Sequence, residues 1–508
     1  MPHLLELGRS YPLYGTANTR LIEQQAAARL PDHTLMQRAG LAVARLAVAL
    51  APHARTLWVA CGPGNNGGDG LEAAMHLRQW GLHPVVTWLR NDERVPLDAK
   101  ASFERARHVG VIFADAPPVL GSQDLCIDAL LGIGLSSASP GPRGTMATWL
   151  EQMASSGAQR LAVDVPSGLN ADTGQWHVAA TEEAHTPARL NPPRRQHTLS
   201  LLTLKPGLFT LQGRDATGTV WFDDLGTPLD LAPEPTSWLN GPPGEDSQHR
   251  PHASHKGSWG DVAVVGGETE PAHGKAMTGA ALLAARAALH AGAGRVYVSL
   301  LGTASPWVDL AAPELMFRRL DAIDLPRTTV VCGCGGGSAV GNAIGPILRD
   351  AHQLVLDADA LNAIAQAADL QMALSTRGSR GLQTVLTPHP LEAARLLRCG
   401  TAEVQADRLR AAQQLADLFQ CTVVLKGSGT VISAPGQVPH LNPSGNARLA
   451  SAGTGDVLAG MVGAYMAAGT AAFEAACAAV WQHGHAADIW PHGKPLTASA
   501  LCRHIGAR

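Results

Sequence analysis

The 508-residue sequence contains few charged residues and no strong excess of either sign. Asp, Glu, Lys and Arg make up 16% of it, the formal net charge is -3, and no run of Lys and Arg exceeds two residues. Proteins that bind nucleic acids usually carry a basic patch that neutralises phosphates. The sequence therefore argues against a nucleic acid as the main partner.

Cysteine pairs with metal-ligand spacing are also absent. The eight cysteines are scattered without a CxxC pair, and Cys332-Gly333-Cys334 has the wrong spacing for a common metal motif. This usage predicts reduced, buried thiols rather than a disulfide framework or a zinc site.

Long hydrophobic runs are missing too. No apolar stretch reaches about 18 residues free of charge or glycine, which a membrane span would need. The start, MPHLLELGRSYPLYG, lacks the basic and apolar regions of a signal peptide. With 45% hydrophobic residues, the composition is typical of a compact soluble α/β enzyme of several domains, and we expect a cytoplasmic location.

Short apolar runs alternate with Ala-rich helical stretches in both halves of the chain, which predicts parallel sheets with crossover helices. In the first half we expect a helix over 26–50, interrupted near Pro31 and Gly40, and one over 71–80, with strands over 56–61, 84–89, 125–129 and 160–165. In the second half we expect strands over 262–265, 295–300, 329–332, 354–356 and 422–425, a helix over 276–291, and a long helix after Asp456.

A proline-rich polar stretch separates the halves. Six prolines fall between 228 and 251, and such a stretch cannot continue a sheet core. We predict an N-terminal domain over 1–228, a linker over 229–251 and a C-terminal domain over 252–508. The polar segment Thr181–Arg195 is expected to be an exposed loop or insertion.

The first half carries a glycine-rich loop between a predicted strand and a predicted helix. Gly62-Pro63-Gly64-Asn65-Asn66-Gly67-Gly68-Asp69-Gly70 can direct backbone N–H groups at an anion. It formally satisfies GxGxxG, and Asp92 follows about where a dehydrogenase would bind ribose. A dehydrogenase is therefore one alternative.

Two more Asp/Gly segments lie at predicted strand ends. They are Asp128-Ala-Leu-Leu-Gly132-Ile-Gly134-Leu135 and Asp164-Val-Pro-Ser167-Gly168-Leu169. A single aspartate there could be a helix cap or a turn residue, but three such clusters favour a shared site. Together with Leu35–Gly40 and Lys205–Leu208, the segments resemble the epimerase domain of the bifunctional NAD(P)H-hydrate repair enzymes over most of 18–228.

This resemblance implies a Rossmann-like three-layer fold and specific site residues. It implies a potassium ion held by Asn66, Asp128 and Ser167, and Asp164 as the acid–base group. The implied substrate contacts are Asn65, Asn66, Gly67, Gly68, Asp69, Gly132, Ile133, Gly134, Leu135, Ser136, Ser137, Ala138 and Asp164. Thr181–Arg195 departs from the family by intervening before His197.

The second half carries two further glycine segments and lacks the GxxxxGK[ST] motif of P-loop enzymes. Lys426-Gly427-Ser428-Gly429-Thr430 follows a strand, and Gly453-Thr454-Gly455-Asp456 opens a helix that can form an anion hole. Asp456 could accept a proton from an attacking hydroxyl, or it could be only an N-cap.

These segments resemble the ribokinase-like fold, and others narrow the likeness to the ADP/ATP-dependent NAD(P)HX dehydratases over about 252–505. The others are His255–Gly257, Val265–Gly267, Gly279–Ala281, Asp357–Asn362, Thr387–Pro390 and Val404–Arg408. The resemblance implies that Lys426, Gly427, Ser428, Gly429, Thr430 and Gly455 contact ADP or ATP, which binds with Mg²⁺. It implies that Ala280, Gly335, His389 and Asp456 contact the hydrated dinucleotide, with Asp456 as base.

Two departures from the dehydratase pattern stand out. The family's Gly-Pro-Gly-Leu-Gly is Gly333-Cys334-Gly335-Gly336-Gly337, which loses the stiffness of proline. The usual Ala-Ser-Asp-Leu is Ala498-Ser499-Ala500-Leu501, which loses a carboxylate.

The expected function is repair of hydrated NADH and NADPH (NADHX and NADPHX), by epimerisation of the R and S forms and nucleotide-dependent dehydration of the S form. Two alternatives are a small-molecule kinase with an N-terminal ligand-binding module, and a non-catalytic N-terminal binding domain. The preference for ADP or ATP, the preference for NADHX or NADPHX, and transfer of substrate between the sites stay open. A homo-oligomer is a family-level expectation.

Overall fold

The computed structural model describes residues 1–90, 95–135, 141–177, 195–228, 232–244, 252–270, 274–302 and 308–505. Asp92, Ser136, Ser137, Ala138 and residues 181–194 of the predicted insertion lie outside the described residues. The chain forms two compact units, one of Met1–Glu6 with Tyr11–Ser237 and one of Leu7–Ser10 with Trp238–Arg508. The predicted α/β class is confirmed.

The first unit is built on a mainly parallel sheet in the order β1-β9-β8-β7-β6-β3-β4-β5, in which only the β1–β9 pair is antiparallel. Its strands are β1 (His3–Leu4), β3 (Leu57–Cys61), β4 (Pro84–Trp88), β5 (Ile112–Phe113), β6 (Leu125–Ala129), β7 (Gln159–Val163), β8 (Gln196–Leu201) and β9 (Thr219–Asp223), and β2 (Tyr11–Leu13) precedes the first helix. Its helices are α1 (Thr16–Ala27), α2 (Thr34–Leu50), α3 (Asn65–Gln79), α4 (Leu97–His108), α5 (Thr145–Ser155) and α6 (Gly213–Ala216).

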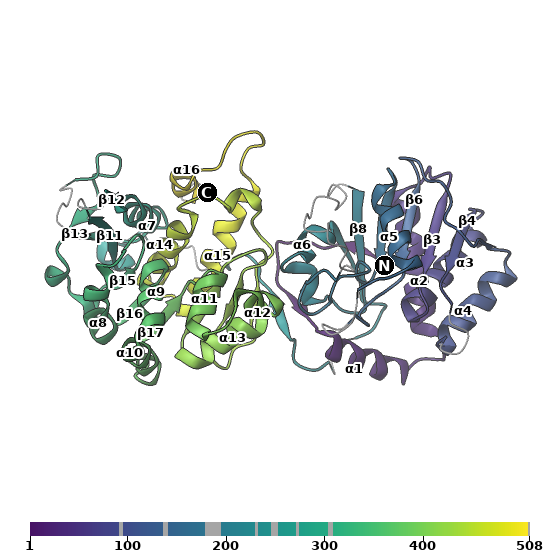
Figure 1. Ribbon diagram of the computed structural model, residues 1–508, viewed down its shortest axis with the longest axis horizontal. Coiled ribbons are helices and arrows are strands. Elements are labelled where there is room, and N and C mark those ends of the chain that lie inside the picture. The colour runs from purple at the N-terminus through teal and green to yellow at the C-terminus, as the bar shows by residue number, and fades with distance from the viewer. Residues whose placement is uncertain are drawn as a thin grey trace. The chain divides into compact units, whose positions relative to one another are not determined.

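Alternation along β3 divides this unit into three layers. Leu57, Val59 and Cys61 belong to the core that contains residues of α2 and α3, whereas Trp58 and Ala60 pack with the α5 residues Trp149 and Met153. Successive side chains of a strand point to opposite faces, so helices cover both faces of the sheet (Figure 1).

The second unit has a sheet in the order β14-β13-β11-β15-β16-β17-β18-β19-β20-β10, parallel from β14 to β18. Its strands are β10 (Ser237–Leu239), β11 (Asp261–Glu270), β12 (Lys275–Ala276), β13 (Arg295–Gly302), β14 (Met316–Phe317), β15 (Thr329–Cys332), β16 (Gln353–Leu356), β17 (Gln383–Leu386), β18 (Thr422–Leu425), β19 (Val431–Ser433) and β20 (His440–Leu441). Its helices are α7 (Thr278–His290), α8 (Val340–Asp350), α9 (Ala358–Gln366), α10 (Ala368–Ser379), α11 (Pro390–Leu397), α12 (Thr401–Ala406), α13 (Arg408–Phe419), α14 (Thr454–Ala467), α15 (Ala472–Asp488) and α16 (Ala498–Ile505).

Helices also cover both faces of the second sheet. α7, α14, α15 and α16 share one core with the valines of the central strands. α8, α9, α10, α11 and α13 pack against one another and against β15, β17 and β18 (Figure 1).

The structure corrects three details of the sequence predictions. α2 passes through Gly40 without interruption. Glycine serves close packing at this position, since a Cβ would lie 2.4 Å from Glu72 Cβ. α3 and α14 begin inside their glycine motifs, at Asn65 and Thr454. Part of the expected linker forms β10, which pairs in parallel with β20.

All eight cysteines are free, and six of them are buried, as the cysteine pattern predicts. Among the described residues, no helix is long and apolar enough to cross a membrane.

Candidate active sites

The first glycine loop turns directly from β3 into α3. Gly64 is the N-cap, and no side chain caps this helix. A Cβ on Gly67 would lie 2.0 Å from Gly62 O, and one on Gly62 would lie 1.8 Å from Leu130 O. Only glycine permits this close packing of the loop, which brings the start of α3 to the carboxyl end of β6. The uncapped N–H groups of a helix start favour an anion.

Asp128 and Ser167 form a buried pair at the neighbouring strand ends. Ser167 Oγ donates to Asp128 Oδ1 at 2.5 Å, and its backbone N–H donates to Oδ2 at 3.1 Å. Asn66 lies close by, because a Cβ on Gly132 would be 3.3 Å from Asn66 Oδ1. The buried Nδ2 of Asn66 has no hydrogen-bond partner among the described residues.

Asp164 lies at the end of β7 and pairs with a buried lysine. The ammonium of Lys205 donates to Asp164 Oδ1, to Leu201 O at 2.7 Å and to Thr203 O at 2.9 Å. The Lys205 side chain is fully buried, and that of Asp164 is 14% exposed. Asp164 has a φ of +67°, a left-handed conformation that few non-glycine residues adopt. A charged pair therefore fixes the predicted acid–base group in a strained position.

Two more carboxyl groups lie near Asp164. Burial, followed by the negative charges of Asp164 and Glu23, raises the pKa of Asp69 well above its usual value. Burial and Asp164 also raise the pKa of Glu23, which α1 supplies. Neither Glu23 nor Lys205 is among the site residues predicted from the sequence. Lys205 could have been noticed in its Lys-Pro-Gly-Leu motif, whereas nothing in the sequence marks Glu23.

In the second unit, polar side chains gather at the carboxyl ends of β15, β16, β17 and β18. Lys426 Nζ donates to Asp357 Oδ1 at 2.6 Å, and Thr387 Oγ1 donates to the same oxygen at 2.8 Å. Asp357 Oδ2 faces Cys334 Sγ, 3.9 Å away. Parallel strands end at one edge of a sheet, where α/β enzymes bind their ligands.

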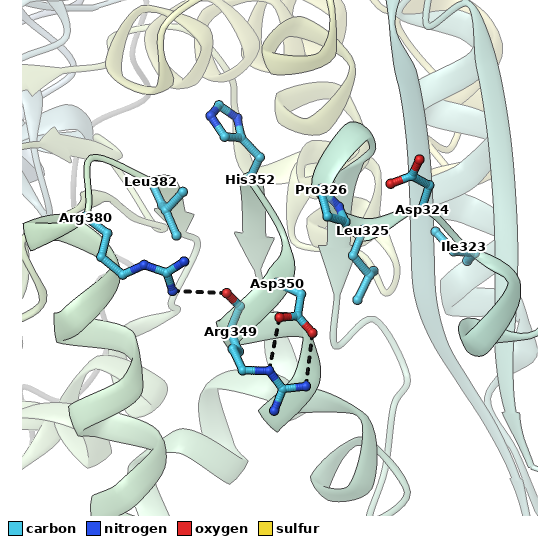
Figure 2. A pocket seen from close by; sticks show the side chains of 9 residues that line it. All are labelled: Ile323, Asp324, Leu325, Pro326, Arg349, Asp350, His352, Arg380 and Leu382. Atoms are coloured by element: carbon cyan, nitrogen blue, oxygen red, sulfur yellow. Dashed lines mark hydrogen bonds and ion pairs between the residues drawn. The ribbon is translucent and has the colours of Figure 1, made fainter.

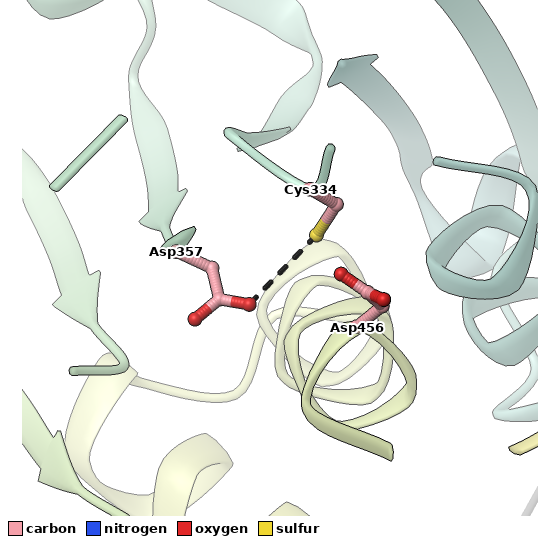
Figure 3. Close-up of side chains that lie close together, drawn as sticks. All are labelled: Cys334, Asp357 and Asp456. Carbon is pink, nitrogen blue, oxygen red and sulfur yellow. Dashed lines mark hydrogen bonds between the residues drawn. The ribbon is translucent and has the colours of Figure 1, made fainter. Parts of the chain in front are cut away.

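Asp456 points toward this group from the first turn of α14 (Figure 3). One carboxylate oxygen each of Asp456 and Asp357 and the sulfur of Cys334 lie within 4.8 Å of one another. Burial, followed by the negative charge of Asp357, raises the pKa of Asp456 to about 7. Gly453 is the N-cap of α14, so the interpretation of Asp456 as an N-cap is wrong. A carboxylate with this pKa is suited to accept a proton at neutral pH.

Backbone N–H groups in and after the glycine loop that contains Cys334 are hydrogen-bonded to carboxylates of the protein itself. Ala339 N donates to the buried Glu268 carboxylate at 2.7 Å, and Gly337 N donates to Asp359 at 2.9 Å. Carboxylates thus occupy the start of α8, whereas no side chain caps α14. Of these two helix starts, the one next to Asp456 is suited to a phosphate.

The other predicted residues surround the same strand ends. A Cβ on Gly335 would lie 2.9 Å from Ala280 Cβ, and one on Gly455 would lie 3.4 Å from Lys426 Nζ. His389 caps α11, where its Nδ1 accepts from the N–H groups of Leu391 and Glu392. Its Nε2 lies 3.1 Å from Glu392 Oε1. His389 is therefore held as a hydrogen-bonded cap of α11, and its contact with substrate stays a prediction.

A cavity of about 550 Å³ lies elsewhere in the second unit (Figure 2). It is lined by Ile323, Asp324, Leu325, Pro326, Arg349, Asp350, His352, Arg380 and Leu382. His352 and Leu382 directly precede β16 and β17, so the cavity is at the amino ends of the strands. It contains none of the predicted site residues.

Comparison with known proteins agrees with this division into two sites. A family described as YjeF-related protein N-terminus matches residues 32–207, and one described as NAD(P)H-hydrate dehydratase matches 262–505. The bifunctional NAD(P)H-hydrate repair enzyme Nnr of Escherichia coli (strain K12) is 37% identical over 471 residues, which cover 90% of this chain and 85% of that protein.

Two further proteins resemble the second half alone. The ADP-dependent (S)-NAD(P)H-hydrate dehydratase of Neisseria meningitidis serogroup B is 41% identical over 263 residues, which cover 50% of this chain and 86% of that protein. A crystal structure of the ADP/ATP-dependent NAD(P)H-hydrate dehydratase of Bacillus subtilis, co-crystallised with ATP and Mg²⁺, is 29% identical and covers 51% of this chain and 91% of that chain, with a TM-score of 0.42.

Proposed function

Because the chain belongs to the family of bifunctional NAD(P)H-hydrate repair enzymes, we propose that its two sites act in sequence on one damaged cofactor. The first unit interconverts the R and S epimers of the hydrate. The second unit removes water from the S form and consumes ADP or ATP. Spontaneous damage yields both epimers, so a stereospecific dehydratase needs an epimerase to reach all of the material.

The geometry around Asp456 carries the proposal for the second unit. Asp456 accepts the proton of the hydroxyl on C6 as that oxygen attacks the terminal phosphorus of the nucleotide, and the bond to the bridging oxygen breaks. The uncapped start of α14 stabilises charge on the transferred phosphoryl group. Phosphate then leaves C6, the neighbouring carbon loses a proton, and the dihydropyridine ring is restored. Mg²⁺ enters with the nucleotide as part of the co-substrate.

In the first unit, we infer that Asp164 moves the proton of the C6 hydroxyl while the ring nitrogen assists departure and return of that group. Lys205 fixes the carboxylate of Asp164. The start of α3 and the Asn65–Asp69 segment would bind the pyrophosphate of the dinucleotide.

Asn66, Asp128 and Ser167 fit a potassium ion. They offer oxygen ligands, which hard cations prefer, and the side chains of Asp128 and Ser167 are buried beside one another. Asp128 has no ion pair with a basic side chain among the described residues. A bound ion would neutralise Asp128 and the pyrophosphate.

The test follows recovery of NADH from an R/S mixture of its hydrate by near-UV absorbance, with ADP, ATP or no nucleotide. We expect complete nucleotide-dependent recovery by the wild type, no recovery with Asp456→Asn, and a slow second phase with Asp164→Asn. A stable phosphorylated product would instead indicate a small-molecule kinase. Intact epimerisation in Asp164→Asn would indicate that Asp164 is not the acid–base group, and would favour a non-catalytic first unit.

A further inference from the structure

A buried arginine lies beneath the loop that we assign to the nucleotide. Arg408, the first residue of α13, is 2% exposed. Its Nη2 donates to Leu425 O at 3.1 Å, to Lys426 O at 3.2 Å and to Gly429 O at 3.5 Å. One guanidinium group therefore donates hydrogen bonds to carbonyl oxygens at both ends of the Lys426–Gly429 turn.

Arg408 has no carboxylate partner among the described ion pairs. Its Nη1 donates to the neutral Gln405 Oε1 at 2.8 Å, and burial lowers its pKa to about 10. A buried charge without a counterion is costly, so the hydrogen bonds that Arg408 donates to the turn must offset that cost.

The turn is closely fitted to the guanidinium. Gly427 has a φ of +140°, and a Cβ on it would lie 2.9 Å from Nη2 of Arg408. The C=O and N–H groups of a planar trans peptide point in opposite directions. Because Lys426 O and Gly429 O face Arg408, the N–H groups of Gly427 and Thr430 are directed away from it.

We propose that Arg408 is a positioning residue for the nucleotide, which holds the Lys426–Thr430 turn with its N–H groups facing the phosphates. This proposal rests on the proposed function of the second unit. Arg408 acts through the shape of the turn: its Nη2 bonds the three carbonyl oxygens while its Nη1 is held by Gln405. A lysine ammonium would end about one bond short of Nη2 and could not hold both sets of partners.

The chain provides a matched control in Arg377. This arginine is 1% exposed, its Nη1 donates to Leu348 O and Ala351 O, both at 2.8 Å, and burial lowers its pKa to about 10. Leu348 and Ala351 precede β16, so Arg377 holds backbone at the amino ends of the strands, away from the proposed site.

The experiment compares Arg408→Lys and Arg408→Met with Arg377→Lys and Arg377→Met in the full chain. It measures KM for ADP, KM for the S hydrate, kcat and the melting temperature, and it measures ADP binding by calorimetry. We expect both Arg408 variants to raise the KM and Kd for ADP about tenfold or more. Their kcat at saturating ADP and their KM for the hydrate should stay near the wild-type values. The Arg377 variants should melt at lower temperature but keep the wild-type KM for ADP.

Wild-type affinity for ADP in the Arg408 variants would overturn the proposal, as would full rescue by lysine. If neither Arg408 variant folds, the same measurements are made on Gln405→Leu, which removes the partner of Arg408 Nη1. An unchanged KM for ADP in that variant would overturn the proposal. A wild type that binds ADP in the calorimeter without dehydrating the hydrate would refute the proposed function, and the calorimetric comparison would still test Arg408.

Discussion

Asp456 combines the position proposed for the catalytic base with a carboxyl group that is reluctant to ionise. Its pKa is raised to about 7 by burial and by Asp357, whereas a base must be ionised to accept a proton. The dehydration rate should therefore rise with pH through about 7 and level off above it. The pH dependence of kcat/KM for the hydrate across pH 5 to 9 tests this, because that ratio reports the pKa of the free enzyme. A flat profile would indicate that another group limits the rate.

The same raised pKa links Asp456 to stability. The folded state binds the proton of Asp456 more tightly than the unfolded state, so this contribution is complete below about 4 and is lost as pH rises through about 7. Asp456→Asn cannot titrate. We expect this variant to gain stability relative to the wild type between pH 5 and pH 8, as urea denaturation at the two pH values would show. An equal difference at both would contradict the link.

Lys205 should matter for both folding and chemistry in the first unit. Lys205→Met leaves the strained Asp164 carboxylate without its partner, and removal of one member of a buried pair costs about 3–5 kcal/mol. We expect a loss of this size in urea denaturation, together with slow epimerisation. Lys100→Met, on an exposed position of α4, is the control and should change neither.

At the scale of the elements, glycine permits close contact of α7 and α14. A Cβ on Gly460 would lie 2.0 Å from Ala284 O, so Gly460→Ala must separate the two helices. We expect a loss of about 1–3 kcal/mol in stability, typical of overpacking, and slower dehydration because α14 carries Asp456. Gly341→Ala, in α8 with no atom within 4 Å of the added Cβ, should be neutral or slightly stabilising. Chemical denaturation of both variants measures the difference.

The central parallel strands of both units could be predicted, because they are continuous apolar runs bounded by glycine and aspartate. Most helices outside the glycine motifs, such as α8 to α13, were not among the predictions. The errors have tertiary causes. Gly40 stays helical because Glu72 packs against it, and β10 forms because β20 offers an edge for parallel pairing. Neither partner is near in sequence.

The site residues also divide into those that could be predicted from the sequence and those that could not. Asp456, Lys426 and the glycine turns lie in motifs that the sequence displays. Glu23 and Glu268 do not, because each acquires its role only when folding brings it beside a distant loop. Arg408 was visible in a motif, but its three carbonyl partners are 17 to 21 residues away in sequence.

At the scale of the whole molecule, each unit has its own sheet and core. We therefore expect the two activities to be separable. Asp164→Asn should dehydrate pure S hydrate at the wild-type rate, and Asp456→Asn should still interconvert the epimers, as chiral chromatography of the hydrate would show. Loss of both activities in either variant would mean that the units depend on each other. The expected homo-oligomer stays a prediction, which the molar mass from light scattering would test.

The arginine at position 408 keeps its charge over the whole range in which Asp456 titrates, because its pKa of about 10 lies well above that of Asp456, about 7. Titration of the proposed base should therefore leave the proposed nucleotide turn unchanged. Acidification should slow dehydration, whereas the Kd for ADP should stay nearly constant.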